Sequence, residues 1–153
     1  MARITLRSFR DEDLPALVAL YQRAYAEHPE YGEATPEASQ RYLEWLQRHH
    51  TFFQLAEDDA GRVIGFVVAH ANWRDRDGQR VGEIHELVVD PEYWGHGLGG
   101  RLLEAALAHL KAHGHRRARL WVGEHNDRAR TFYIRHGFRP VRSGYWVRME
   151  KRL

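Results

Sequence analysis

The chain has 153 residues, a length that suits one domain in which a sheet is covered by helices. Its 23 lysine and arginine residues against 21 aspartate and glutamate residues give a net charge of +2, too small to indicate a nucleic-acid partner by itself. It has no cysteine, which excludes disulfides and thiol nucleophiles. It also has no apolar run long enough to span a membrane and no pattern typical of a signal peptide. We therefore expect a cytoplasmic protein without a membrane partner.

Hydrophobic periodicity and turn residues predict the elements in chain order. A strand is expected at 4–9, then a helix that Asp11 or Asp13 caps and a second helix from Thr35 to about His49. The following elements are expected as strands at 51–57, 62–71 and 82–89, a helix at 98–113, a strand at 117–122, a helix at 127–136 capped by Asn126, and strands at 138–142 and 145–151.

The unit at 82–122 is a strand, a helix and a strand, which requires a parallel crossover. The other strands follow one another through short turns. The order β-α-α-β-β-β-α-β-α-β-β therefore predicts an α/β fold with a mixed sheet and helices on both faces, in a single domain over residues 1–153.

A glycine-rich turn separates the strand expected at 82–89 from the helix expected at 98–113. It reads Asp-Pro-Glu-Tyr-Trp-Gly-His-Gly-Leu-Gly-Gly from Asp90 to Gly100. Glycine lets backbone N–H groups approach a ligand, and the N-terminus of a helix carries partial positive charge. The turn therefore predicts a site for a phosphate or diphosphate group.

Two sequence signatures occur in the second half of the chain, separated by the spacing found in a known family. The first is the turn from Trp94 to Gly99, and the second is made by Asn126, Ala129, Phe132 and Tyr133 followed by Gly137 and Phe138. Together they resemble the GNAT superfamily of acyl-CoA-dependent N-acyltransferases, whose patterns are Arg/Gln-x-x-Gly-x-Gly/Ala and Asn-x-x-Ala-x-x-Phe-Tyr. The resemblance covers essentially the whole chain and implies a mostly antiparallel sheet with a central parallel pair.

The resemblance also implies the reaction, the transfer of an acetyl group from acetyl-CoA, the acyl-donor cosubstrate, to a primary amine by direct attack in a ternary complex. The turn would hold the diphosphate of coenzyme A, and the strand before it would pair with the pantetheine arm and stabilise the oxyanion through a backbone N–H. The cofactor-binding residues are accordingly expected to be Leu87, Val88, Val89, Trp94, Gly95, His96, Gly97, Leu98, Gly99, Gly100, Asn126, Arg128, Ala129 and Tyr133.

One position departs from the family pattern, because Trp94 stands where the family usually has arginine or glutamine. Backbone N–H groups would then hold the phosphates with less help from a side chain. Arg101, Arg128 and Arg130 are candidates to supply the charge, and each is also readable as an exposed helix arginine.

Three residues are the expected catalytic groups: Tyr133, Glu83 and His85. By the resemblance, the phenol of Tyr133 protonates the leaving thiolate, and Glu83 stands where several family members have their general base. In a regular strand Glu83 and His85 share one face and act together, whereas Glu86 faces the other side unless a β-bulge intervenes. Each of the strand residues Glu83, His85 and Glu86 is also consistent with a purely structural role, as a solvated or a core residue.

Alternatives remain open. Gly95-x-Gly97-x-x-Gly100 followed by Glu124 also matches a dinucleotide-binding pattern, and an acyl-CoA-binding regulatory domain without turnover would keep the same fold. The histidines lack a complete metal-binding pattern, so we expect no metal, and no motif that reads nucleic acid is present. Finally, we expect five aromatic residues near the acceptor pocket or in the core: Tyr21, Tyr25, Tyr31, Tyr42 and Trp45. The resemblance also implies that a homodimer is possible.

Overall fold

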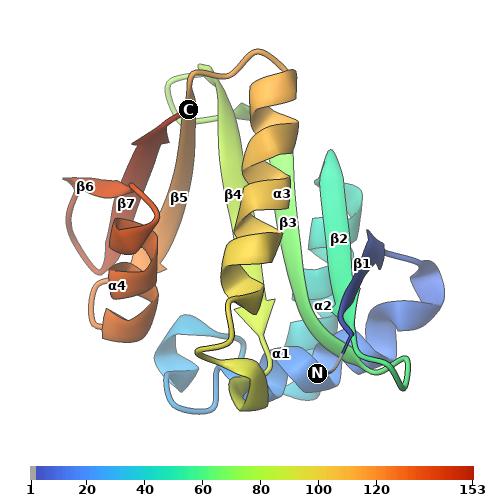
Figure 1. Cartoon of the computed structure of the whole chain (residues 1–153). Helices are drawn as coiled ribbons and strands as arrows, with labels where there is room; N and C mark the ends of the chain where they lie inside the picture. Colours follow the sequence, from blue (N-terminus) through green and yellow to red (C-terminus); the bar gives the residue numbers. More distant parts are fainter. Residues whose placement is uncertain (1–2) are drawn as a thin grey trace.

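The computed structural model describes residues 3–153 and has one seven-stranded sheet in the order β1-β2-β3-β4-β5-β7-β6 (Figure 1). The strands are β1 (Thr5–Ser8), β2 (Phe52–Glu57), β3 (Val63–Arg74), β4 (Arg80–Val89), β5 (Arg117–Gly123), β6 (Arg139–Arg142) and β7 (Trp146–Arg152). The helices are α1 (Leu14–Ala24), α2 (Pro36–Arg48), α3 (Leu98–Ala112) and α4 (Asp127–Arg135), with short 3-10 turns at Asp11–Asp13, Pro29–Tyr31 and Pro91–Tyr93. The predicted order of elements is confirmed.

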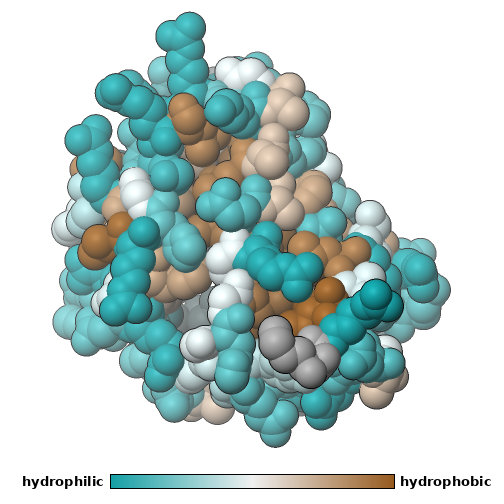
Figure 2. Space-filling model, viewed as in Figure 1, coloured by the Kyte–Doolittle hydropathy of each residue, from teal (hydrophilic) through white to brown (hydrophobic). Residues whose placement is uncertain are grey.

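The sheet separates two hydrophobic cores, and Figure 1 shows α3 in front of the sheet with α1 and α2 behind it. On the α3 face, Leu102, Leu103 and Leu110 are fully buried against β3, β4 and β5. On the other face, Leu17 and Leu43 pack on Phe66. The face that carries α3 is mostly covered by hydrophilic side chains, and hydrophobic ones show only in patches between the elements (Figure 2). The sheet is therefore buried on both sides, as the expected fold class requires.

The pair β4–β5 is parallel, and the other neighbouring strands are antiparallel. In the described residues the register of the parallel pair is given by one bridge, Glu83 opposite Arg119. Arg119 donates hydrogen bonds to Asp75 at 3.1 Å and to Glu150 at 2.8 Å. These charge-assisted bonds tie β5 to the β3–β4 turn and to β7 at the end of the sheet where the bridge lies.

Two predicted helix caps have different outcomes. Asn126 caps α4 as expected, because its side-chain oxygen accepts a hydrogen bond from the N–H of Ala129 at 3.4 Å. The expectation that Asp11 or Asp13 caps the first helix is wrong: Asp13 stands at the N-cap position of α1 but makes no side-chain cap bond. Its carboxylate instead accepts two hydrogen bonds from Arg7, at 2.8 and 2.7 Å, and one from the backbone N–H of Arg10, at 2.8 Å, at the start of the preceding 3-10 turn.

Over residues 3–153, no helix combines the length and apolar character needed to cross a membrane.

One packing contact of the fold is directly testable. A Cβ added at Gly123 would overlap the ring of Tyr31, whereas a Cβ at Gly144 would have its nearest neighbour at 3.8 Å. We expect Gly123→Ala to lower the free energy of unfolding by about 1–3 kcal/mol through overpacking, a fall in Tm of several degrees. The measurement is thermal unfolding with Gly144→Ala as the control, and equal melting temperatures for the two variants would contradict the contact.

Candidate active site

The strands β4 and β5 separate beyond their bridge and open a cleft at the end of the sheet to which both strands run. A cavity of about 1660 Å³ fills this cleft, larger than the range of about 300–1,000 Å³ that is common for small-molecule sites. Leu87, Val88 and Val89 line one side, and Leu120–Gly123 line the other. Because β4 has no neighbouring strand along this edge, its backbone groups are available to an extended ligand.

The glycine-rich turn forms one end of the cavity. Gly95 and Gly97 have φ values of 82° and 81°, in the left-handed region that glycine adopts at no steric cost, and Gly97 is the N-cap residue of α3. Gly99 lies against α4, because a Cβ there would come within 3.2 Å of the ring of Phe132. The first N–H groups of α3 have no partner within the helix, so this end of the cavity suits a phosphate group.

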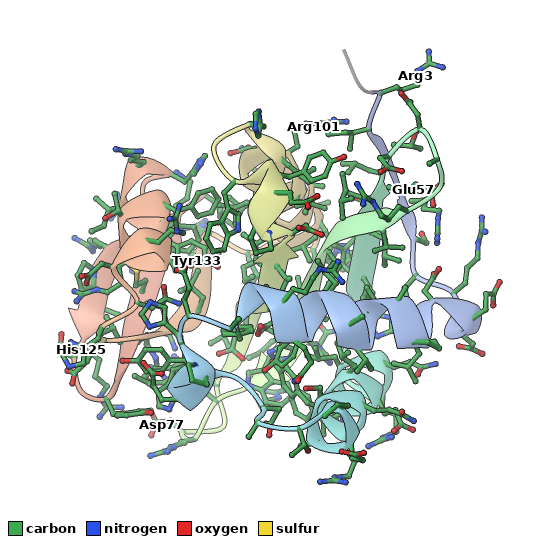
Figure 3. All side chains as sticks on the ribbon, turned by 90° about the horizontal axis from the view of Figure 1, so that it is seen from below. Arg3, Glu57, Asp77, Arg101, His125 and Tyr133 are labelled. Atoms are coloured by element: carbon green, nitrogen blue, oxygen red, sulfur yellow. The ribbon has the colours of Figure 1, made fainter. Side chains whose placement is uncertain are left out.

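Helix α4 forms a second wall, with Asn126, Arg128, Ala129 and Tyr133 lining the cavity. Figure 3 shows Tyr133 on the side of α4 that faces the middle of the molecule. Its side chain is buried, and burial together with the nearby charge of Glu86 raises the pKa of the phenol above its usual value. Tyr133 therefore keeps its proton at neutral pH and is available as a proton donor.

A β-bulge in β4 changes the faces that the sequence pattern predicts. The register with β3 runs from Val68 opposite Glu86 directly to Ala69 opposite Ile84, so β4 has one extra residue, His85. The bulge lets His85 and Glu86 both lie on the face that packs against α1 and α2. The expectation for a regular strand, with Glu86 on the opposite face, is therefore wrong. The exception stated with it, a β-bulge in this strand, is what the structure has.

Glu86 is held between two tyrosines from the helices behind the sheet. Its carboxylate accepts hydrogen bonds from the hydroxyl groups of Tyr25, at 2.5 Å, and Tyr42, at 3.0 Å. Burial raises the pKa of Glu86 to about 7, although the two hydrogen bonds act in the opposite direction. Glu86 lines the cavity, so the cleft contains a carboxyl group that titrates near neutral pH.

Glu83 and His85 do lie together, with His85 Nδ1 3.1 Å from Glu83 Oε2. The other ring nitrogen, Nε2, is buried without a hydrogen-bond partner in the described part of the chain. The imidazole packs among indoles, with ring-centroid distances of 4.6 Å to Trp73 and 5.4 Å to Trp45. Within this pair His85 lines the cavity, whereas Glu83 is buried and does not.

An aromatic wall bounds the other end of the cavity. Tyr31 accepts a hydrogen bond from the N–H of His125 at 2.9 Å, and Tyr145 donates one to the carbonyl of Glu30 at 3.0 Å. The ring of Tyr31 lies 5.4 Å from that of Tyr145 and 5.3 Å from that of Trp146. The segment between α1 and α2 is thereby joined to the β6–β7 hairpin and to the start of α4.

Most of the residues expected from the sequence line this one cavity. Among the described residues the exceptions are Glu83, the exposed His96 of the turn, and the candidate phosphate ligands Arg101 and Arg130. Of the expected acceptor-side aromatic residues, Tyr21, Tyr25, Tyr31 and Tyr42 line the cavity, whereas Trp45 packs against His85. Sequence reasoning underestimated Glu86, because no local signal reveals a bulge or the distant tyrosines that bind its carboxylate.

Comparison with known proteins agrees with this geometry. The model of the Acetyltransferase (GNAT) family matches residues 14–138. The chain belongs to the GNAT family. It is therefore an acyltransferase, and acetyl-CoA is its acyl donor.

Relatives of this GNAT protein match along nearly its whole length. An uncharacterized N-acetyltransferase of Methanocaldococcus jannaschii is 37% identical over 153 residues, 97% of this chain and 67% of that protein. A mycothiol acetyltransferase of Thermobispora bispora is 40% identical over 140 residues, 88% of this chain but only 46% of that protein. A crystal structure of a Pyrococcus horikoshii OT3 protein has a TM-score of 0.87 at 32% identity, with 99% of each chain covered.

The family assignment decides between the readings of the glycine-rich turn. The dinucleotide-binding alternative calls for a doubly wound parallel sheet, whereas in the described residues β4–β5 is the one parallel pair. Membership of the GNAT family favours coenzyme A as the ligand of the turn, and the cleft between β4 and β5 is where the GNAT resemblance expects the pantetheine arm.

The raised pKa of Glu86 makes a prediction about stability. Below about pH 4.5 the carboxyl is protonated in both folded and unfolded protein, but between about pH 4.5 and 7 it ionises first in the unfolded chain. The contribution of Glu86 to wild-type stability therefore falls across this window, and this loss persists above it. We expect the Tm of Glu86→Gln minus that of the wild type to increase as the pH rises from 4.5 to 7.5.

The control for this measurement is Glu104→Gln, which removes an exposed carboxylate from α3. Thermal unfolding of the three proteins at a series of pH values, at constant ionic strength, provides the comparison. A difference between Glu86→Gln and the wild type that stays constant with pH would show that Glu86 titrates normally.

Proposed function

We propose that this GNAT enzyme transfers the acetyl group of acetyl-CoA to a primary amine by direct attack, with donor and acceptor bound together in the β4–β5 cleft. One observation carries the proposal: a single cavity contains the glycine-rich turn, the phenol of Tyr133 and the carboxyl of Glu86. Since the chain has no cysteine, a cysteine-linked acyl enzyme is excluded, which favours direct transfer.

In this mechanism Glu86 is the general base. An alkyl ammonium ion has a reference pKa of about 10.4 and must lose a proton before it attacks. A base whose pKa is close to 7 is well matched to this task at neutral pH, and its ionised form accepts hydrogen bonds from Tyr25 and Tyr42. The amine proton passes to Glu86 directly or through a water molecule.

The pair Glu83 and His85 is the second candidate for the base. It is supported by the buried Nε2 of His85, which has no hydrogen-bond partner in the described residues, and by the 3.1 Å approach of Nδ1 to Glu83. A carboxylate that orients an imidazole is a common catalytic arrangement. We favour Glu86 because its carboxyl lines the cavity and has a pKa of about 7, whereas the free nitrogen of the rival pair, Nε2 of His85, is buried.

Tyr133 is the proposed general acid. The neutral amine nitrogen forms a bond to the carbonyl carbon of the thioester, and a backbone N–H of β4 stabilises the oxyanion. The nitrogen, now positively charged, releases its second proton to solvent, and the carbon–sulfur bond breaks as the oxyanion collapses to the amide. The departing thiolate takes the phenolic proton of Tyr133, which solvent then replaces. Because its pKa is raised, Tyr133 holds this proton at neutral pH, so the phenol is in the form that can donate it.

The acceptor is proposed to enter on the side of α1 and α2. There the cavity is lined by the carboxylates of Glu27 and Glu33 and by the aromatic wall of Tyr31, Tyr145 and Trp146. Carboxylates attract an ammonium group, and aromatic faces bind cations and apolar surfaces. These features support an amine with an apolar or flat portion.

The reaction itself is tested by release of the free thiol of coenzyme A across a broad amine panel. The absence of cysteine is an advantage, since a thiol reagent reacts only with the product. We expect turnover with at least one class of primary amines. Binding of acetyl-CoA without thiol release for every amine would instead indicate the regulatory domain without turnover.

The choice of base is tested by two matched variants, Glu86→Gln and Glu83→Gln. With Glu86 as the base, kcat/KM of the wild type should rise with pH through about 7, because the ionised form is the active one. Glu86→Gln should lower kcat by about 100-fold or more and remove this limb, whereas Glu83→Gln should keep it. The opposite result would assign the base to the pair of Glu83 and His85.

The role of Tyr133 is tested by Tyr133→Phe, which keeps the ring and removes the proton. We expect kcat to fall by about 100-fold while the Kd for acetyl-CoA changes by less than about threefold. Steady-state kinetics and calorimetric titration provide the two values. A variant that turns over as fast as the wild type would exclude Tyr133 as the acid.

A further inference from the structure

The departure from the family pattern at Trp94 has a structural counterpart on α4. The indole of Trp94 is anchored, because its Nε1 donates a hydrogen bond to the carbonyl of Val89 at 3.0 Å. The guanidinium carbon of Arg128 lies over the indole, 4.1 Å from the ring centroid. Both side chains line the cavity, so the pair joins the glycine-rich turn to α4 at the mouth of the coenzyme A cleft.

The three arginines that the sequence offers as phosphate ligands are placed differently. Arg101 is an exposed residue of α3 outside the cavity lining, and Figure 3 shows it away from Tyr133. Arg130 donates a hydrogen bond to the carbonyl of Glu124 at 2.9 Å. Arg128 has no carboxylate within ion-pair distance among residues 3–153, so its charge is not neutralised inside the protein.

We propose that Trp94 and Arg128 together form a phosphate clamp for coenzyme A, in which Arg128 supplies the charge and Trp94 positions it. A guanidinium that lies flat on an indole is attracted through its face, which leaves the N–H groups at its edge free to donate hydrogen bonds. Those donors match a phosphate in geometry and charge. The clamp is thus made by two residues from opposite sides of the cleft, where the family pattern has one polar side chain.

This inference depends on the family's donor, acetyl-CoA, and is independent of the proposed acceptor and general base. It is therefore tested by binding rather than by turnover. The phosphates of coenzyme A are its diphosphate and its 3′-phosphate, and either is chemically suited to Arg128. The ligands to be used are coenzyme A, dephospho-coenzyme A, which lacks the 3′-phosphate, and pantetheine, which lacks all three phosphates.

We expect Arg128→Gln to raise the Kd for coenzyme A by about 10- to 30-fold and to reduce its dependence on salt, while the Kd for pantetheine stays the same. The control is Arg101→Gln, which removes the same charge from an exposed position outside the cavity and should leave every Kd unchanged. If the effect of Arg128→Gln is lost with dephospho-coenzyme A, the clamp holds the 3′-phosphate; if it persists, the clamp holds the diphosphate.

Trp94 is tested as the positioning residue through its dependence on Arg128. Trp94→Ala should weaken coenzyme A binding in the wild-type background but add little in the Arg128→Gln background, and Trp94→Phe should restore much of the affinity by keeping an aromatic face. Thermal unfolding checks that each variant is folded. If Trp94→Ala does not fold, the binding data for Arg128→Gln alone decide whether the clamp exists. The clamp is refuted if Arg128→Gln binds coenzyme A as tightly as Arg101→Gln, or if it loses pantetheine to the same extent.

Discussion

The site depends on the way in which the parallel pair β4 and β5 is joined at one end and open at the other. The bridge between Glu83 and Arg119 is the point of attachment, and Arg119 is itself fixed by hydrogen bonds to Asp75 and Glu150. Beyond this point β4 presents an edge without a neighbouring strand, in the interior of a sheet where such edges are normally paired. The cavity, the backbone groups for an extended ligand and the facing positions of α3 and α4 all follow from this separation.

The side chains of the site come from both faces of the sheet, and those from each face suit a different ligand. The turn before α3 and the helix α4 contribute glycine backbone, Arg128 and Tyr133, which suit an anionic ligand with a thiol end. The helices α1 and α2 contribute Tyr25 and Tyr42, which hold the carboxyl of Glu86. The proposed donor and acceptor sides are therefore built from different parts of the chain, and they meet at β4 and at the contact of Tyr31 with the N–H of His125.

Sequence patterns predicted the features that depend on local chemistry. The glycine-rich turn, the Asn126 cap and the order of the elements are all encoded within a few residues of where they occur, so they were predictable. The bulge at His85 was not, because it is visible only as a change of register with β3. The cap expected from Asp13 failed for a related reason, since Arg7 from another element binds its carboxylate.

The aromatic wall at the acceptor end has a consequence for flexibility. Tyr31, Tyr145 and Trp146 join segments that are far apart in the sequence, and they do so through ring contacts and two hydrogen bonds outside the ladder of the sheet. Because these contacts lie outside the ladder of the sheet, separating them would leave the strands paired. In the proposed reaction, such a separation would widen the acceptor end for a bulkier amine without unpairing the strands.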